Sequence, residues 1–226
     1  MQSLFSEKVD AKSDTRNGAA RGETVVPKKN EFTLSREILN LRSSLLRAKE
    51  ESGVNSLLLS GLEKGVGTTS IASALALALA WDKVTRVLII DANFDNPQLD
   101  KVFNIPADKR AGLIRDTRLP NLKCIPYARL IRAGNRQFDS FMRVLNELEN
   151  EFDFLIVDSA PLNSDPEVIM LSGYFKSIAV IVEAEKTRVP VLEKAINELR
   201  QAKANVLGVI LNRKKSYLPK AIENLL

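Results

Sequence analysis

The sequence has very little of the chemistry that many enzymes depend on. Among its 226 residues there is no histidine and only one cysteine, Cys124. Cys124 lies in the apolar run LKCIP, and with no histidine to activate it, we expect a buried strand thiol rather than a nucleophile. A single cysteine excludes a disulfide within the chain, which fits a reducing compartment.

Long apolar runs are also absent. The longest nearly apolar stretch, Ile71 to Trp81, is too short to span a bilayer, and the first residues, MQSLFSEKVD, lack the apolar core of a signal peptide. The 33 Lys+Arg against 28 Asp+Glu leave a net charge of only +5. Such scattered charge favours a solvated surface over nucleic-acid or anionic-membrane binding. We therefore expect a cytoplasmic chain with no nucleic-acid partner and no direct membrane insertion.

The apolar content, 45% of the residues, is enough for one full core. Residues 1–30 have few large apolar side chains and are predicted to form a flexible N-terminal arm, with one globular domain over residues 31–226. The domain should open with an amphipathic helix that ends near Gly53. Its apolar residues recur at helical spacing: Leu34, Ile38, Leu41, Leu45 and Leu46.

After this helix, apolar runs alternate with helical patterns. Six runs predict strands that are buried on both faces: VNSLLLS, RVLIID, LKCIP, FDFLIVD, SIAVIVE and VLGVIL. This alternation predicts an α/β fold, a three-layer sandwich with a mainly parallel central sheet. Right-handed crossovers would bring Gly65 to Thr69, Asp91 and Asp158 to one edge, where such sheets bind ligands.

A glycine loop links the first predicted strand to a helix within Leu57 to Thr69, LLLSGLEKGVGTT. Gly65 and Gly67 allow successive backbone N–H groups to turn inward, and the helix beginning near Thr68 directs its positive end at the same point. The alternative is a tight strand-to-helix turn with no ligand. A Walker A loop, GxxxxGK[ST], has a lysine after its last glycine, and Thr68 stands in that position here.

Two further strands end in carboxylates. RVLIIDANFDNP delivers Asp91, and FDFLIVDSAP delivers Asp158 after four apolar residues, as in a Walker B strand. Oxygen ligands suit Mg²⁺, so Thr69, Asp91 and Asp158 are the predicted metal ligands. The alternative for Asp91 is an aspartate that caps the next turn.

Taken together, these segments resemble the cytoplasmic domain of bacterial tyrosine kinases of the CpsD/CapB type, within the MinD/ParA class of P-loop ATPases. The resemblance runs from about Glu31 to Arg213 and rests on the glycine loop, DANFDNP, VDSAP and the ending VLGVILNR. It implies a P-loop NTPase fold and ATP or ADP with Mg²⁺ as ligand, with Asn212 and Arg213 near the adenine. The implied nucleotide-binding residues are Lys64, Gly65, Val66, Gly67, Thr68, Thr69, Ser70, Asn212 and Arg213.

Departures from the family pattern change three functional positions. Thr68 replaces the loop lysine, Asn93 replaces the second aspartate of DxDxRxP, and Asp95 replaces its arginine. Losing a charge-assisted contact to phosphate costs about 1.5–3 kcal/mol, or about one to two decades in affinity. The transition state should lose more. Lys64 could supply a charge from before the loop, while Glu63 occupies the position of the lysine that MinD/ParA proteins share across a dimer.

Two other family features are reduced. The tail RKKSYLPKAIENLL holds only Tyr217 where these kinases have a tyrosine cluster, and Arg36, Leu39 and Arg42 stand in place of the ExxRxxR of the ring-forming helix. Some self-association stays open. Leu218, Ile222 and Leu225 could form one apolar face of a short helix, which we expect to pack on its own domain rather than on a membrane.

The resemblance implies a role in exopolysaccharide or capsule biosynthesis and export. We expect a catalytically degenerate protein that binds the cytoplasmic part of a chain-length determinant or polysaccharide co-polymerase membrane protein, and is thereby recruited to the inner face of the cell membrane. One alternative is an active ATPase or protein-tyrosine autokinase of the same pathway, using Lys64. A second is a MinD/ParA-type positioning ATPase.

Overall fold

The structure is a computed structural model that describes residues 35–93, 96–106, 112–125 and 138–214, with only the backbone for 138–144. The predicted arm, Asp95 and the tail with Tyr217 lie outside the described residues. The described helices are α1 (Arg36–Ser52), α2 (Thr68–Ala80), α3 (Leu99–Val102), α4 (Phe138–Glu151), α5 (Pro166–Ser172) and α6 (Val189–Gln201). The strands are β1 (Ser56–Gly61), β2 (Val87–Ala92), β3 (Arg115–Asp116), β4 (Leu122–Ile125), β5 (Phe154–Ser159), β6 (Ser177–Glu183) and β7 (Val206–Asn212).

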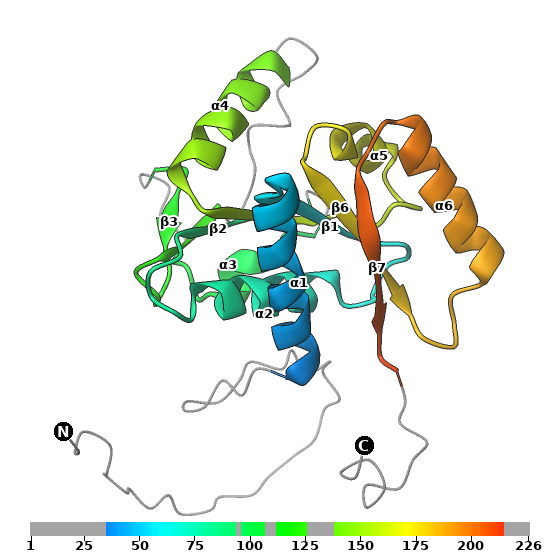
Figure 1. The fold of residues 1–226 in the computed structure, drawn as a ribbon, viewed down its shortest axis with the longest axis horizontal. Coiled ribbons are helices and arrows are strands. Elements are labelled where there is room, and N and C mark those ends of the chain that lie inside the picture. The colour runs from blue at the N-terminus through cyan, green and yellow to red at the C-terminus, as the bar shows by residue number, and fades with distance from the viewer. Residues whose placement is uncertain (1–34, 94–95, 107–111, 126–137, 215–226) are drawn as a thin grey trace, which may run out of the picture. The chain divides into compact units, whose positions relative to one another are not determined.

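The strands form one seven-stranded sheet in the order β3-β4-β2-β5-β1-β6-β7. All neighbouring pairs are parallel except β3 with β4. Helices α1, α2 and α3 lie on one side of the sheet and α4, α5 and α6 on the other (Figure 1). The predicted α/β three-layer fold with a mainly parallel sheet is confirmed.

Both faces of the sheet are packed because its central strands are apolar on both sides. One buried cluster joins side chains such as Leu88 and Leu155 to the layer of α4, α5 and α6, and the other joins Leu57 and Ile89 to the layer of α1 and α2. Every residue of β1, β2 and β5 is buried. Continuous apolar runs of this kind are what a parallel strand covered on both faces requires.

Helix α1 follows the sequence pattern closely. The Ser35 hydroxyl caps its start by accepting a hydrogen bond from the Ile38 N–H at 3.4 Å, and the helix ends where Gly53 adopts φ +66°. Leu45 is buried against the sheet layer, and Lys49 lies over the Phe154 ring at 4.6 Å. The predicted amphipathic helix ending near Gly53 is confirmed.

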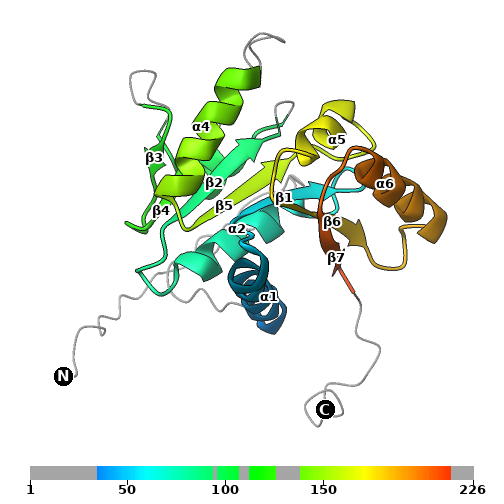
Figure 2. The same cartoon turned by 45° about the horizontal axis from the view of Figure 1, so that its top comes forward.

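One prediction about the sheet needs correction, and one short strand was not predicted. The run VLGVIL was expected to be buried on both faces, but β7 is an edge strand whose residues alternate between partly buried and exposed. Strand β7 has a neighbouring strand on one side only (Figure 2), so fewer side chains surround it than surround a central strand. The two-residue strand β3 was not predicted, because two residues carry no periodic signal.

Two further observations concern the thiol and the helices. Cys124 is fully buried in β4, and burial raises the pKa of its thiol far above the usual value, which suits an inert core residue. Within the residues that the structure describes, no helix is both long enough and apolar enough to cross a membrane.

Candidate functional site at the glycine loop

The sheet brings the predicted site residues to one edge. Strand β5 lies between β2 and β1, with Asp158 opposite Asp91 on one side and opposite Leu59 on the other. Because these strands are parallel, their carboxyl ends meet at one edge, and Thr69, just after the loop that follows β1, lies near Asp158. Two hydroxyls fasten the strand ends: Ser60 Oγ donates to the Ala160 carbonyl at 2.7 Å, and Ser159 Oγ donates to the Leu59 carbonyl at 3.1 Å.

The glycine loop has the backbone that the sequence predicted. Gly65 and Gly67 adopt φ of +82° and +96°, values that side-chain-bearing residues rarely reach. Helix α2 starts at Thr68, and no side chain caps its first turn. The N–H groups at the start of a helix without a cap need another acceptor, and an anion is a suitable one.

Asn212, at the end of β7, holds this loop from the other side. Its Nδ2 donates a hydrogen bond to the Val66 carbonyl at 2.7 Å, although 146 residues separate the two in sequence. A Cβ added at Gly67 would collide with the same Nδ2 atom, so Gly67 is required for the close approach as well as for its φ. The resemblance places Asn212 near the adenine, and the structure places it against the glycine loop.

Thr68 stands where a Walker A lysine would be, and its side chain turns back toward the start of the loop. Its Oγ1 lies 2.7 Å from the position a Cβ would take at Gly61, which makes a side chain at Gly61 incompatible with this arrangement. Thr68 and Thr69 are partly buried, whereas Lys64 and Ser70 are exposed. Thr68 therefore packs within the loop and contributes a hydroxyl but no charge.

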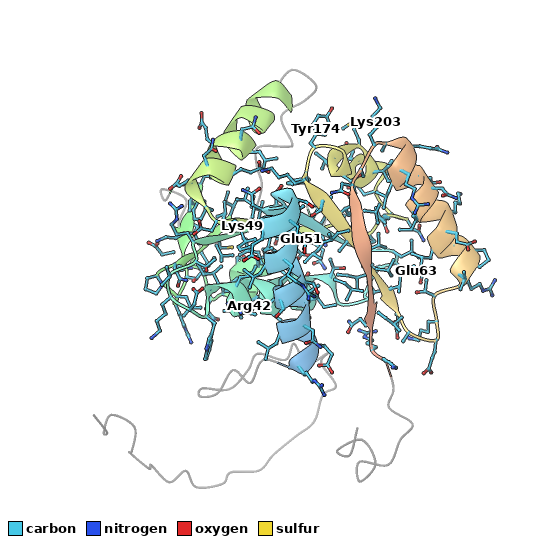
Figure 3. The ribbon with its side chains drawn as sticks, viewed as in Figure 1. Arg42, Lys49, Glu51, Glu63, Tyr174 and Lys203 are labelled. Atoms are coloured by element: carbon cyan, nitrogen blue, oxygen red, sulfur yellow. The ribbon has the colours of Figure 1, made fainter. Side chains whose placement is uncertain are left out.

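Three charged side chains discussed above, Glu63, Lys64 and Arg213, are solvent-exposed. Glu63 precedes Lys64 at the outer surface of the loop (Figure 3). Arg213 adopts φ +56° and its Nη1 pairs with Glu183 Oε2 at 3.1 Å. Glu183 also pairs with Lys186 at 2.6 Å, so the Arg213 guanidinium is held at the ends of β6 and β7.

Asp158 is a buried carboxyl at the end of β5. It is 1% exposed, and neither carboxylate oxygen accepts a hydrogen bond of normal geometry from the described residues. Burial raises its pKa to about 7; the nearby Thr69 hydroxyl opposes this rise and the Asp91 charge adds to it. A buried, unpartnered acidic group of this kind is well suited to receive a cation or a hydrogen-bond donor from a ligand.

Asp91 is as buried as Asp158, but both of its carboxylate oxygens accept hydrogen bonds. Oδ2 accepts from the N–H groups of Gln98 and Leu99 at 2.8 and 3.0 Å, and Oδ1 accepts from that of Asn93 at 3.1 Å. Burial raises the pKa of Asp91 to about 6, although these hydrogen bonds counteract the rise. This geometry is that of the alternative we considered, an aspartate that organises the turn after its strand, and its role as a metal ligand stays a prediction.

The donors present suit a magnesium ion bound together with a ligand better than a bare ion. Among the described residues there is no group of three or more Asp, Glu, Cys or His side chains that could hold a metal. Asp158 and the Thr69 hydroxyl would supply oxygen ligands, and Mg²⁺ usually completes its shell with water and substrate phosphates. Any metal here would thus depend on phosphate oxygens.

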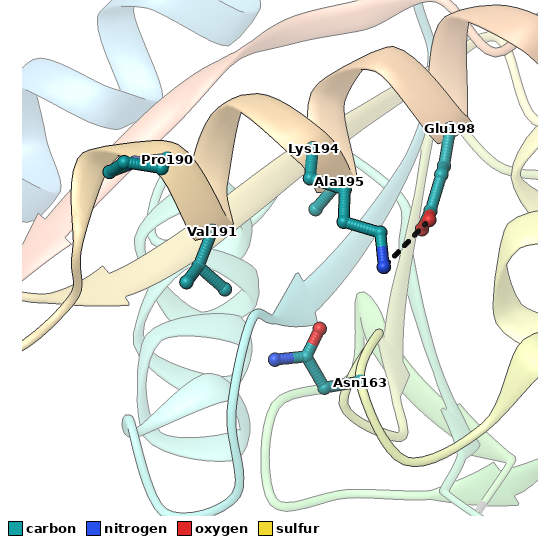
Figure 4. A pocket seen from close by; sticks show the side chains of 6 residues that line it. All are labelled: Asn163, Pro190, Val191, Lys194, Ala195 and Glu198. Atoms are coloured by element: carbon teal, nitrogen blue, oxygen red, sulfur yellow. Dashed lines mark ion pairs between the residues drawn. The ribbon is translucent and has the colours of Figure 1, made fainter.

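A separate hollow of about 490 Å³ lies between the loop after β5 and helix α6 (Figure 4). Apolar side chains of α6 and the ion pair of Lys194 with Glu198, 3.7 Å apart, line it opposite Asn163. None of its lining residues belongs to the predicted site. The glycine loop, rather than this hollow, combines a helix start with buried carboxyls.

Known proteins share this architecture. The family described as cellulose biosynthesis protein BcsQ matches residues 54–202, which include the glycine loop, Asp91 and Asp158. The chain belongs to this family. CapB of Staphylococcus aureus is 25% identical over 204 residues, covering 82% of this chain and 86% of CapB. The tyrosine-protein kinase Ptk of Acinetobacter johnsonii is 31% identical over 189 residues, which cover 76% of this chain and only 25% of Ptk.

Solved structures agree on the fold. The chimerical protein CapA2B2 superposes with a TM-score of 0.69 at 23% identity, covering 84% of this chain and 88% of that one. The septum site-determining protein MinD from Pyrococcus horikoshii, solved with Mg-ADP, gives a TM-score of 0.57 at 20% identity and covers 76% and 77% of the two chains. This BcsQ-family chain is therefore related to bacterial tyrosine kinases and has a MinD-like P-loop NTPase fold.

Three small residues that support the glycine loop were not predicted from the sequence. Gly61 makes room for Thr68, and Ser60 and Ser159 join the ends of β1 and β5. Small residues at strand ends were the only signal, and small residues occur at many strand ends. Their function here depends on which strands are neighbours, which the chain order does not reveal.

Proposed function

We propose that this chain is a catalytically degenerate relative of bacterial tyrosine kinases that acts by binding. Its role is that of a cytoplasmic partner or regulator in exopolysaccharide or capsule biosynthesis and export. The observation that carries the proposal is Thr68: at the position of the Walker A lysine, an uncharged side chain packs within its own loop. Asn93, which replaces a second aspartate, points the same way.

The features of the family's nucleotide site that this chain retains fit a weak Mg-nucleotide site. The uncapped start of α2 offers N–H groups to phosphate, while Thr69 and Asp158 offer oxygens to Mg²⁺. Nucleotide at this site would have a structural role. Phosphoryl transfer needs positive charge where the γ-phosphate changes charge, and Thr68 provides none.

Lys64 is the residue on which an active enzyme would depend. It is exposed and precedes Gly65, so its ammonium group would have to leave solvent and cross the loop to reach a phosphate. Ordering a long, exposed side chain costs up to about 2 kcal/mol of rotamer entropy. Tyr217, the acceptor in that alternative, lies outside the described residues.

The proposed binding partner is the cytoplasmic part of a polysaccharide co-polymerase membrane protein, which would bring the chain to the inner face of the membrane. Relatives named as tyrosine-protein kinases motivate this assignment. The chain spans only a quarter of one of them, so the partner of the whole relative is carried over here as part of the proposal alone. Purified chain should retain a cytoplasmic segment of such a membrane protein in a pull-down with or without nucleotide.

Calorimetry tests the nucleotide site. Mg-ADP titrated into the unmodified chain should bind weakly, and Thr68→Lys should tighten the Kd about 10- to 100-fold by restoring a charge-assisted contact. Ser43→Lys, which adds the same charge on exposed α1, should leave the Kd unchanged. Tight binding by the unmodified chain that Lys64→Ala abolishes would favour the active enzyme instead.

A further inference from the structure

The side-chain amide of Asn212 is engaged at both of its polar ends. Its Nδ2 donates to the Val66 carbonyl at 2.7 Å, and its Oδ1 accepts from the Arg213 N–H at 2.9 Å. A carbonyl can only accept and a backbone N–H can only donate, so these two partners fix which end of the amide is which. The amide is therefore oriented by the chain itself, without a ligand.

The amide is also packed against the loop that it supports. A Cβ added at Gly67 would collide with Nδ2, so the amide lies directly on the backbone of the loop. Val66 is 3% exposed, so its carbonyl has almost no access to water that could replace Asn212 as a donor. If the amide turned toward a ligand, this carbonyl would lose its partner.

A second polar group at the ends of β6 and β7 is held by the chain in a similar way. The Glu183 carboxylate pairs with Lys186 at 2.6 Å and with Arg213 at 3.1 Å. A carboxylate that could accept a hydrogen bond from the amino group of a base is thus already paired with two cations. The Arg213 side chain is 53% exposed, and a guanidinium plane can stack on any base.

These contacts bear on which nucleotide the glycine loop takes. We propose that the site binds nucleoside diphosphates through their phosphates without selecting the base, and that Asn212 is a positioning residue for the loop. This inference rests on the proposed function, because it concerns the ligand of the same loop. The phosphates that the N–H groups at the start of α2 would hold are the same in every nucleoside diphosphate.

Turning the Asn212 amide toward a base would gain about as much as it loses. An amide reads a base when its donor and acceptor pair with the base edge together, and such a pair discriminates by about 5- to 150-fold. Leaving the Val66 carbonyl unsatisfied costs a factor in about the same range. Among the described contacts, one N–H and one lone pair of the amide have no partner, and a single contact of that kind is worth about fivefold.

Titrations with three ligands test this assignment. Mg-ADP, Mg-GDP and Mg-pyrophosphate are titrated by calorimetry into the unmodified chain and into Thr68→Lys. We expect the Kd values for ADP and GDP to agree within about fivefold in both proteins. Adding Asn212→Ala should weaken all three ligands by a common factor of about 5 to 10, because a loosened loop holds every phosphate less well. Pyrophosphate is the most informative ligand, since it has no base.

Asn205→Ala is the matched control. Asn205 Nδ2 also donates to a backbone carbonyl, that of Lys176 at 2.8 Å, but Asn205 precedes β7 and so lies at the opposite end of that strand from Asn212. This variant should leave all three Kd values unchanged.

Two kinds of result would overturn the inference. A larger preference for one base, or a loss in Asn212→Ala that spares pyrophosphate, would show that Asn212 reads the base, and would leave the proposed nucleotide site standing. Binding of none of the three ligands by either protein would overturn the proposed site, and this inference with it. Denaturant titration of each variant shows that a lost affinity is not a lost fold.

Discussion

The buried carboxyl of Asp158 should make the protein less stable as the pH rises. Its pKa is raised from an unfolded value of 3.8 to about 7 in the folded state, mainly by burial. Below about pH 4 the group is protonated in both states, so it has no effect on the pH dependence there. Between about pH 4 and 7 the unfolded chain loses this proton while the folded chain keeps it, so the free energy of unfolding falls.

The magnitude follows from the difference of about 3 between the two pKa values, which corresponds to about 4 kcal/mol at most. Asp91 titrates beside Asp158, so the transition belongs to the pair, and part of the effect is shared. Asp158→Asn removes one ionisation and keeps the shape. Any cost of the buried amide is the same at every pH, so the stability of Asp158→Asn relative to the unmodified chain should grow by about 2–4 kcal/mol from pH 4 to pH 8.

Urea denaturation of both chains across this pH range measures the difference. Asp153→Asn is the control of opposite sign. Burial is the largest single influence and raises the pKa of Asp153, but the hydrogen bonds from the Arg86 backbone and guanidinium, with the charges of Arg86 and Lys49, together outweigh it and lower the pKa overall. Asp153→Asn should therefore lose stability relative to the unmodified chain at neutral pH and less in acid. A stability difference for Asp158→Asn that does not vary with pH would refute this reasoning.

The remaining predictions concern the loop and its supports. Asp91→Ala should destabilise the fold by about 2–5 kcal/mol, since it leaves one buried and two partly buried N–H groups without an acceptor; a loss below about 0.5 kcal/mol in denaturant titration would contradict the capping geometry. Gly67→Ala should cost about 2 kcal/mol and Gly65→Ala about 1, because only Gly67 also meets Asn212. Adding Asn212→Ala to Gly67→Ala should recover part of the loss, as a double-mutant cycle would measure.

The central strands could be predicted from the sequence because each of them is a nearly continuous run of apolar residues. Strands β1, β2 and β5 are buried at every residue, so no alternation confuses the pattern. The same type of run misled at β7, since Leu207 and Val209 look like core residues in sequence and are exposed in the structure. Whether an apolar strand is central or at an edge depends on strand order, which the sequence does not state.

The sequence predicted which residues form the candidate site, but not the hydrogen bonds that these residues make. The glycines, Thr68 and the two strand-ending aspartates all follow from the sequence pattern. Asp91 accepts hydrogen bonds from backbone N–H groups, while Asp158 accepts none of normal geometry from the described residues, and this difference depends on how the loop after β2 folds. The hydrogen bond from Asn212 to Val66 likewise needs β7 and the loop to be brought together across most of the chain.

The central claim is that the glycine loop binds without transferring phosphate. The most direct test is phosphate release and protein phosphotyrosine formation by the unmodified chain with Mg-ATP, alongside Asp158→Asn and Thr68→Lys. The account predicts no turnover above the Asp158→Asn background for the unmodified chain. Robust turnover by the unmodified chain that Asp158→Asn abolishes would contradict it.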